Sequence, residues 1–296
     1  MESKPNKSSL VVIVGETGSG KSSLAIELAK LFNGEIIAAD SRTIYRGMDI
    51  GTAKPTIAEQ QEIPHHLIDV VDPDQSFTAA DFKRLAVESI NDIASRGKLP
   101  IMVGGTGLYV DSVLYDFAFS DQPDVKLRES LQGLDVTELQ QIIKDKGLQL
   151  PSNDRNPRHL MRTIETNGVK TVQSPLRANT LVIGIETDRE VLRERIAKRV
   201  QRMIADGLVA EVTLLVDQFG WDAPGLQSPG YRTFRQYLGG RGTVEEAQKQ
   251  LITEHMQLAK RQRTWFRRNK NINWLCKKEE VVDLVTTFLN KVYTDK

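Results

Sequence analysis

Short uninterrupted apolar runs recur along the chain and alternate with longer segments of helical periodicity. Runs of this kind are typical of strands that are buried on both faces of a parallel sheet. They predict four strands, at Leu10–Val14, Glu35–Ala39, Leu99–Val103 and Leu181–Ile185. Two weaker runs predict further short strands at Leu67–Val71 and Asn271–Leu275.

Segments with helical spacing lie between the predicted strands. The first helix is expected at Ser22–Phe32, where Leu24, Leu28 and Leu31 share one face and Gly34 ends the segment. Further helices are predicted from a capping box at Thr78 and Asp81 to about Gly97, and over Glu190–Ile204 and Val244–Arg268. Because strands and helices alternate, the sequence predicts an α/β fold with a parallel sheet and right-handed crossovers.

The pattern changes between residues 118 and 179, where polar helical segments replace the strand-like runs. We therefore expect a core that begins at residues 1–117, a helical insertion at 118–179, and a return to the core at 180–296. A further helical segment is expected at about 205–250, followed by a basic C-terminal helix.

Composition limits the classes of protein that fit this chain. Its 296 residues carry a net charge of +1, so any nucleic acid would have to bind to local basic patches. Cys276 is the only cysteine, which excludes an internal disulfide and a cysteine-based zinc cluster and fits a reducing cytosol. The polar start of the chain and the lack of a long apolar run predict a cytoplasmic protein without a membrane segment.

The strongest chemical motif is VGETGSGKSS at residues 14–23, between the first predicted strand and helix. Its spacing is that of a phosphate loop, in which backbone N–H groups and a helix N-terminus surround a phosphate. Lys21 would reach the outer phosphate and the Ser22 hydroxyl would bind Mg²⁺. The expected phosphate-binding residues are Gly15, Thr17, Gly18, Ser19, Gly20, Lys21 and Ser22. The alternative is a glycine-rich turn that binds nothing.

A second feature is an aspartate after the second predicted strand. The run PIMVGGTG ends in glycines where an ATP-hydrolysing enzyme would place an aspartate on Mg²⁺. Asp40 instead follows strand 35–39, at the sheet edge where ligands bind. It could hold Mg²⁺ through water, take a proton from an acceptor, or cap a turn. The residues alone therefore predict a phosphotransferase-like site.

Several motifs in order resemble the tRNA dimethylallyltransferase family, over residues 10–275. They are GETGSGKS (15–22), DSRTIY (40–45), GMDIGTAKP (47–55), HHLID (65–69), GGTGLY (104–109), NPRHLMRTIE (156–165), GYR (230–232) and AKRQRTWFR (259–267). The resemblance implies a P-loop NTPase-like core and Mg²⁺ as the metal. It also implies that the loop binds dimethylallyl diphosphate and that the acceptor is N6 of adenosine 37 in the anticodon stem-loop of tRNA.

The resemblance also implies roles for individual residues. Asp40 would take the proton of N6, and Arg232 would join Lys21 in stabilising the diphosphate as it leaves. Thr106 would lie beside the reacting centre, or would cap the helix that starts near Leu108. The implied tRNA contacts are Ser41, Tyr45, Thr52, Lys54, Arg158, Arg162, Gln262 and Arg263.

The basic run at residues 259–271 is expected to face solvent, because Leu251, Leu258 and Trp265 form a helical stripe toward the core. A second basic row, Arg195, Arg199 and Arg202, could follow RNA phosphates. The alternative for the run at 259–271 is a solvated basic face without an RNA contact. We expect a monomer.

Three residues depart from the family's motifs: Glu16 replaces a proline, Thr43 a glutamine and His159 an arginine. We expect the Glu16 carboxylate to point away from the diphosphate. His65 and His66 are expected to have structural roles. Three other functions share parts of the pattern: an isopentenyltransferase acting on free AMP, ADP or ATP, a small-molecule kinase, and an RNA-binding protein switched by a nucleotide.

Overall fold

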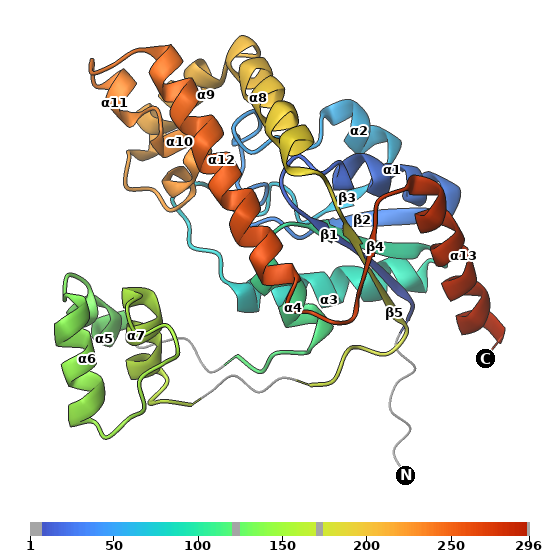
Figure 1. Ribbon diagram of the computed structural model, residues 1–296, viewed down its shortest axis with the longest axis horizontal. Coiled ribbons are helices and arrows are strands. Elements are labelled where there is room, and N and C mark those ends of the chain that lie inside the picture. The colour runs from blue at the N-terminus through green and yellow to red at the C-terminus, as the bar shows by residue number, and fades with distance from the viewer. Residues whose placement is uncertain (1–7, 120–124, 170–173, 295–296) are drawn as a thin grey trace. The chain divides into compact units, whose positions relative to one another are not determined.

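A six-stranded parallel sheet forms the centre of the larger part of the molecule (Figure 1). The structure, a computed structural model, describes residues 8–119, 125–169 and 174–294. The strand order is β3-β2-β4-β1-β5-β6. The strands are β1 (Leu10–Gly15), β2 (Gly34–Ala38), β3 (His65–His66), β4 (Leu99–Gly104), β5 (Thr180–Ile185) and β6 (Ile272–Leu275). The predicted α/β fold with a P-loop-like parallel core is confirmed.

One predicted strand is wrong. The strand expected at Leu67–Val71 lies two residues earlier, at His65–His66, where it pairs with β2. Leu67 and Asp69 have positive φ angles of 63° and 54°, which an extended strand cannot accommodate. Val71 makes only an isolated parallel bridge to Tyr45.

Helices cover the sheet and extend beyond it. The longer ones are α1 (Lys21–Leu31), α3 (Ala79–Ser95), α4 (Gly107–Leu114), α8 (Arg189–Ala205), α9 (Leu208–Phe219), α12 (Val244–Phe266) and α13 (Lys278–Thr294). The shorter ones are α2 (Ile57–Glu62), η1 (Gly225–Gln227), α10 (Pro229–Arg232) and α11 (Arg235–Leu238). The capping box predicted at Thr78 and Asp81 is confirmed at the start of α3.

The end of α1 differs from the prediction. Leu24 and Leu28 are buried, but Leu31 is 59% exposed, so the apolar face is shorter than expected. The last residue of α1 is Leu31, and Phe32 is its C-cap. Asn33 then adopts a positive φ of 49° in the turn between α1 and β2. Gly34 already belongs to β2, where a Cβ would come within 2.8 Å of the Leu99 carbonyl oxygen. This glycine is needed for close strand packing.

Two of the apolar clusters in the described residues pack helices against the sheet and against the segment that follows β2. One joins α1 and α13 to side chains on β1, β2, β4 and β5. The other joins α8, α9, α10 and α12 to the segment that follows β2, around Ile44 and Met48. Tyr231 and Phe234 are fully buried in this second cluster. The helices after β5 therefore pack around the loop that carries the DSRTIY motif.

Residues Tyr115–Pro175 form a separate compact unit, and the rest of the described chain forms the other. The smaller unit contains α5 (Val125–Leu131), α6 (Val136–Asp145) and α7 (Pro157–Glu165). Its own apolar core consists of Leu131, Leu139, Ile143, Leu160 and Ile164. Asp135 and Glu138 form a capping box on α6, and Asn156 caps α7. The RNA-binding role expected for this region stays a prediction.

Glu35 lies at the base of β2 and has a side chain that is only 2% exposed. Its carboxylate accepts hydrogen bonds from Arg96 (2.5 and 2.7 Å), Lys98 (2.7 Å) and the His66 ring (2.7 Å). The bonds from Arg96, acting against the cost of burial, hold the pKa of Glu35 well below its usual range. His65 is held by the Ile63 carbonyl oxygen. Both histidines therefore have protein partners.

We expect Glu35→Gln to lower the free energy of unfolding by about 2 kcal/mol at neutral pH, because it leaves partly buried cations without their counter-charge. Because its pKa is lowered in the folded state, Glu35 contributes this stability above about pH 4.3 and loses it as the pH falls. Denaturant unfolding at several pH values measures both effects. The control is Glu62→Gln, which breaks an exposed pair with Lys30 and should cost less than about 1 kcal/mol. Equal losses in the two variants would contradict the prediction.

Candidate active site

The phosphate loop connects β1 to α1 at the carboxyl edge of the sheet. Gly18 and Gly20 have positive φ angles of 82° and 92°, which glycine adopts without strain. A Cβ on Gly18 would also press against Ile196 and Leu192 of α8, at 3.2 and 3.3 Å. Gly20 is the N-cap of α1, so the N-terminus of that helix points its free N–H groups at the loop.

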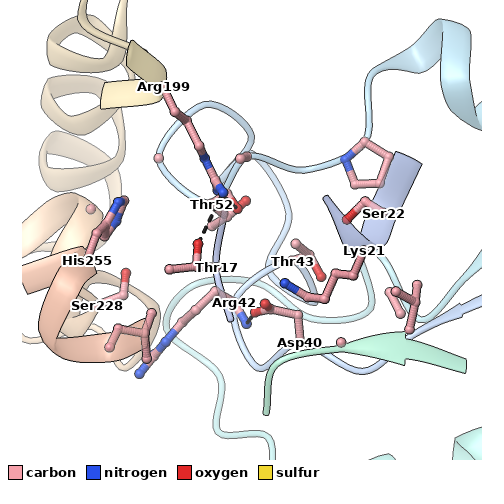
Figure 2. A pocket seen from close by; sticks show the side chains of 18 of the residues that line it. Thr17, Lys21, Ser22, Asp40, Arg42, Thr43, Thr52, Arg199, Ser228 and His255 are labelled. Carbon is pink, nitrogen blue, oxygen red and sulfur yellow. Dashed lines mark hydrogen bonds between the residues drawn. The ribbon is translucent and has the colours of Figure 1, made fainter. Parts of the chain in front are cut away.

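A cavity of about 130 Å³ opens beside this loop. Figure 2 shows the Lys21 and Asp40 side chains pointing toward each other across it. Its polar lining includes Thr17, Lys21, Ser22, Asp40, Arg42, Thr43, Thr52, Arg199, Ser228, His255 and Gln262. A second, more open cavity of about 780 Å³ shares Lys21, Ser22 and Arg199 with the first. The structure therefore brings the loop and Asp40 to one space.

Lys21 is a partly buried cation that lines both cavities. Burial lowers its pKa to about 8, and the Asp40 carboxylate partly offsets this effect. Its ammonium donates a hydrogen bond of 3.2 Å to the Glu16 carbonyl oxygen. A phosphate group bound beside Lys21 would favour the charged form and raise this pKa again.

The Asp40 carboxylate is oriented by its own turn. Its Oδ1 accepts a hydrogen bond of 2.9 Å from the backbone N–H of Arg42. The next residue, Ser41, donates its backbone N–H to the Thr106 hydroxyl at 3.0 Å. Thr106 thus links the turn after β2 to the turn after β4. It is not among the residues that line the cavity.

The glycines after β4 are required by close packing. A Cβ on Gly104 would lie 2.0 Å from the Ala39 carbonyl oxygen, and one on Gly105 would lie 2.1 Å from the Gln262 amide. A Cβ on Gly107 would lie 2.3 Å from the Trp265 ring. An aspartate therefore has no room at the end of β4, where many P-loop enzymes hold Mg²⁺.

Helix α12 holds the phosphate loop from the side. The Gln262 side chain accepts a hydrogen bond from the Thr17 N–H (2.8 Å) and donates one to the Gly105 carbonyl oxygen (3.1 Å). Arg263 forms an ion pair with the Glu16 carboxylate. Both residues were predicted as tRNA contacts, but in the structure their polar groups bind other parts of the protein.

The buried face of α12 also differs from the prediction. Trp265 is 38% exposed and Leu258 is only partly buried, so the expected stripe is wrong. The buried residues are Ala247, Leu251, His255, Ala259, Gln262 and Phe266. The buried face of α12 is rotated relative to the predicted one because the polar side chains of His255 and Gln262 turn inward.

Arg232, which is expected to stabilise the leaving diphosphate, lies away from both cavities in the structure. Its side chain is 56% exposed, pairs with Glu254 at 3.3 Å and lines neither cavity. Arg199 is partly buried, lines both cavities, and donates hydrogen bonds to the Thr17 hydroxyl (3.1 Å) and the Thr52 carbonyl oxygen (3.4 Å). Figure 2 shows the Arg199 side chain reaching Thr17 from α8. Arg199 belongs to the row of arginines identified in the sequence. Its position between Ile196 and Val200, which are both buried, was the sequence signal that could have placed it inside the protein.

The other predicted tRNA contacts lie in different surroundings. Lys54 is buried, and its ammonium contacts the Tyr45 carbonyl oxygen (2.9 Å) and the carboxylates of Asp49 and Asp69 (both 2.5 Å). Tyr45 itself is 5% exposed, whereas Thr52 lines the cavity. RNA would have to displace protein partners to reach Lys54. Arg158 and Arg162 lie on α7 of the smaller unit.

Four buried polar atoms of the cavity lining have no hydrogen-bond partner among the described residues: Thr43 Oγ1, Arg199 Nε, Ser228 Oγ and His255 Nδ1. Burial and the nearby Arg199 charge lower the pKa of His255 to about 4, so its imidazole is neutral at physiological pH. Buried polar groups normally bond to a partner, so this lining is suited to a polar ligand.

The residues present fit Mg²⁺ that is shared with a phosphate ligand. Mg²⁺ takes oxygen ligands, typically one or two from the protein and the others from phosphate and water. The Ser22 hydroxyl and the Asp40 carboxylate supply such oxygens in the same lining. The described residues contain no group of three or more His, Cys, Asp or Glu that could hold a metal ion without a ligand.

Comparisons with known proteins agree on one family. The sequence model of the IPP transferase family matches residues 43–269. A tRNA dimethylallyltransferase of Staphylococcus epidermidis is 42% identical over 306 residues, which cover 95% of this chain and 92% of the relative. That of Bacillus subtilis is 41% identical and covers 90% of each chain.

Solved structures give the same result. The full-length tRNA isopentenylpyrophosphate transferase of Bacillus halodurans matches with a TM-score of 0.75 and 37% identity, covering 96% of this chain and 97% of its own. A eukaryotic dimethylallyltransferase acting on tRNA matches with a TM-score of 0.72 and 27% identity, covering 88% and 70%. Within the described residues no helix has the length and apolar character to span a membrane.

We expect the affinity for inorganic diphosphate to fall as the pH rises through about 8, because Lys21 loses its proton there. The loss should approach about tenfold per pH unit, since binding requires the charged form. Calorimetric titration with magnesium diphosphate from about pH 7 to about pH 9.5 measures it. Lys21→Arg, which keeps its charge at every such pH, corrects for the titration of the ligand itself. Parallel profiles in the two proteins would rule out Lys21 as the titrating group.

Proposed function

This chain belongs to the IPP transferase family, and on that premise we propose that it transfers a dimethylallyl group from dimethylallyl diphosphate to tRNA. The proposed acceptor is N6 of adenosine 37 in the anticodon loop, and diphosphate is released. The observation that carries this proposal is a single cavity in which the phosphate loop and the Asp40 carboxylate face each other.

The phosphate loop would bind the diphosphate of the donor. Lys21, Arg199 and the free N–H groups at the start of α1 supply positive charge on one side of the cavity. As the allylic C–O bond breaks, negative charge grows on the leaving diphosphate, and fixed donors that stabilise it lower the barrier. The apolar lining by Ile36, Ala38 and Val103 would suit the hydrocarbon part of the donor.

Asp40 would act as the base. The exocyclic N6 of adenine is a poor nucleophile because its lone pair is delocalised into the ring. As N6 forms its bond to the allylic carbon, the Asp40 carboxylate accepts one N6 proton, and the electron pair of the C–O bond leaves with the diphosphate. The hydrogen bond from Arg42 to Oδ1 keeps the carboxylate directed into the cavity.

Mg²⁺ is the proposed cofactor. Ser22 would hold it together with the diphosphate, and Asp40 would contribute through water. When bound, the ion would add positive charge beside the leaving group.

Several residues are proposed to recognise the tRNA. The neutral groups of Thr43, Ser228 and His255 suit the uncharged edges of an extruded base, because they can donate or accept hydrogen bonds without opposing its charge. The further proposed contacts are Ser41, Tyr45, Thr52, Lys54, Arg158, Arg162, Gln262 and Arg263. The proposed location is the cytoplasm, and the proposed state is a monomer.

The function is tested by incubating the protein with dimethylallyl diphosphate and unmodified tRNA, AMP or neither. We expect the isopentenyl mass on adenosine of the tRNA and release of diphosphate only when tRNA is present. Transfer to AMP alone would contradict the proposed acceptor. ADP formation from ATP, without use of the allylic donor, would indicate a kinase instead.

We expect Asp40→Asn to lower kcat for prenyl transfer by about a thousandfold, because the amide cannot accept the N6 proton. Binding of tRNA should change little, since the RNA contacts remain. Single-turnover assays and filter binding measure the two effects. A variant with normal kcat would exclude Asp40 as the base.

We expect substitutions of Arg199 and Arg232 to differ in their effect on stabilisation of the leaving diphosphate. Arg199→Gln should lower kcat/KM for the donor by about a hundredfold, because it removes a partly buried donor from the cavity. Arg232→Gln should change it by less than about threefold, since Arg232 is exposed and paired with Glu254. Steady-state kinetics at saturating tRNA measure both. The reverse order would return the role to Arg232.

A further inference from the structure

The phosphate loop of this protein contains an acidic residue. Glu16 directly follows β1, and its side chain is only 6% exposed. A phosphate loop binds its anion through N–H donors and a positive helix end, so a buried carboxylate beside it opposes binding. Something in the protein has to offset this charge.

Arg263 supplies the opposite charge. Its guanidinium binds both Glu16 oxygens, through Nε to Oε1 and through Nη2 to Oε2 at 3.0 Å. The same Nη2 donates to the Thr187 carbonyl oxygen at 3.0 Å, just after β5. The Glu16 bond raises the pKa of Arg263 further above its ordinary value, so Arg263 stays charged. This two-point geometry is the strongest that an arginine and a carboxylate form.

The preceding residue strengthens the same link. Gln262 accepts the Thr17 N–H, so two successive residues of α12 hold two successive residues of the loop. Among the described residues, only Arg263 of α12 donates hydrogen bonds to the Glu16 carboxylate, and the same guanidinium is held by the Thr187 carbonyl oxygen after β5. The direction of the Glu16 carboxylate, and with it the loop backbone, is therefore fixed by α12.

We propose that Arg263 is a positioning residue of the phosphate loop. It neutralises Glu16 and turns the carboxylate away from the anion site, so that the loop can bind the diphosphate of the donor. The identity of that donor rests on the proposed function, but the pairing does not. Arg263 then acts mainly on donor affinity, because the groups it would offer to an RNA phosphate are bound to Glu16 and Thr187.

The proposal is tested by calorimetric titration of magnesium diphosphate into the wild type and into Arg263→Gln, Glu16→Gln and the double variant. Arg263→Gln should bind at least about tenfold more weakly, because it leaves Glu16 charged and free to turn. Glu16→Gln should bind about as well as wild type. The double variant should recover to within about threefold of wild type, because neither charge remains.

Arg267→Gln is the matched control. Arg267 lies four residues further along and pairs with exposed Glu186, so it should leave diphosphate affinity unchanged. Arg263→Lys, which keeps the charge but not the two-point contact, should fall between wild type and Arg263→Gln. It also tests the pairing if Arg263→Gln does not fold, as judged by its thermal unfolding.

Two outcomes would overturn the proposal. One is a double variant as weak as Arg263→Gln. The other is Arg263→Gln with normal diphosphate affinity and a raised KM for tRNA, which would make Arg263 an RNA contact. Since inorganic diphosphate binding requires no transfer reaction, a wild type that transfers no prenyl group would contradict the proposed function and leave this test intact.

Discussion

The hydrogen bond from the Thr17 N–H to the Gln262 side chain joins segments that are 245 residues apart in the chain. The same amide reaches the Gly105 carbonyl oxygen, so one side chain connects the turn after β1, the turn after β4 and helix α12. The anion site is therefore not a local property of the glycine-rich motif. Its shape depends on a helix that the chain adds only after the fifth strand, and on the helices that pack α12 in place.

The sheet could be predicted from the sequence because its strands are buried on both faces. The runs Leu10–Val14, Leu99–Val103 and Leu181–Ile185 contain no charged side chain, which is typical of strands with both faces buried. The segment at 67–71 is also mostly apolar, yet Leu67 and Asp69 adopt positive φ. Hydrophobicity does not report backbone conformation, so a partly buried turn and a short strand look alike in the sequence.

The site was harder to predict because it is built from buried polar residues. His255 and Gln262 turn toward the cavity from α12, and Arg199 does so from α8. Periodicity assigns polar side chains to the solvent face of a helix. It therefore predicted that the buried face of α12 contains Leu258 and Trp265, whereas the buried face contains His255 and Gln262. The partners that make such burial favourable, such as the Thr17 N–H, are remote in sequence and become visible only in the fold.

The position of Asp40 after β2 follows from the packing of α12 against the end of β4. Strand β4 lies between β1 and β2 in the sheet, but Gly104 and Gly105 at its end have no room for a side chain. A carboxylate must then come from β2, two strands away from the loop, which is a distance of about 10 Å in a parallel sheet. A kinase needs its carboxylate next to the phosphates, where it holds the metal. The proposed reaction joins a carbon beside the diphosphate to an amine beyond it, so its base has to reach the cavity from outside the loop. The turn after β2 brings the Asp40 carboxylate to the same cavity from a different strand, which suits that proposed role.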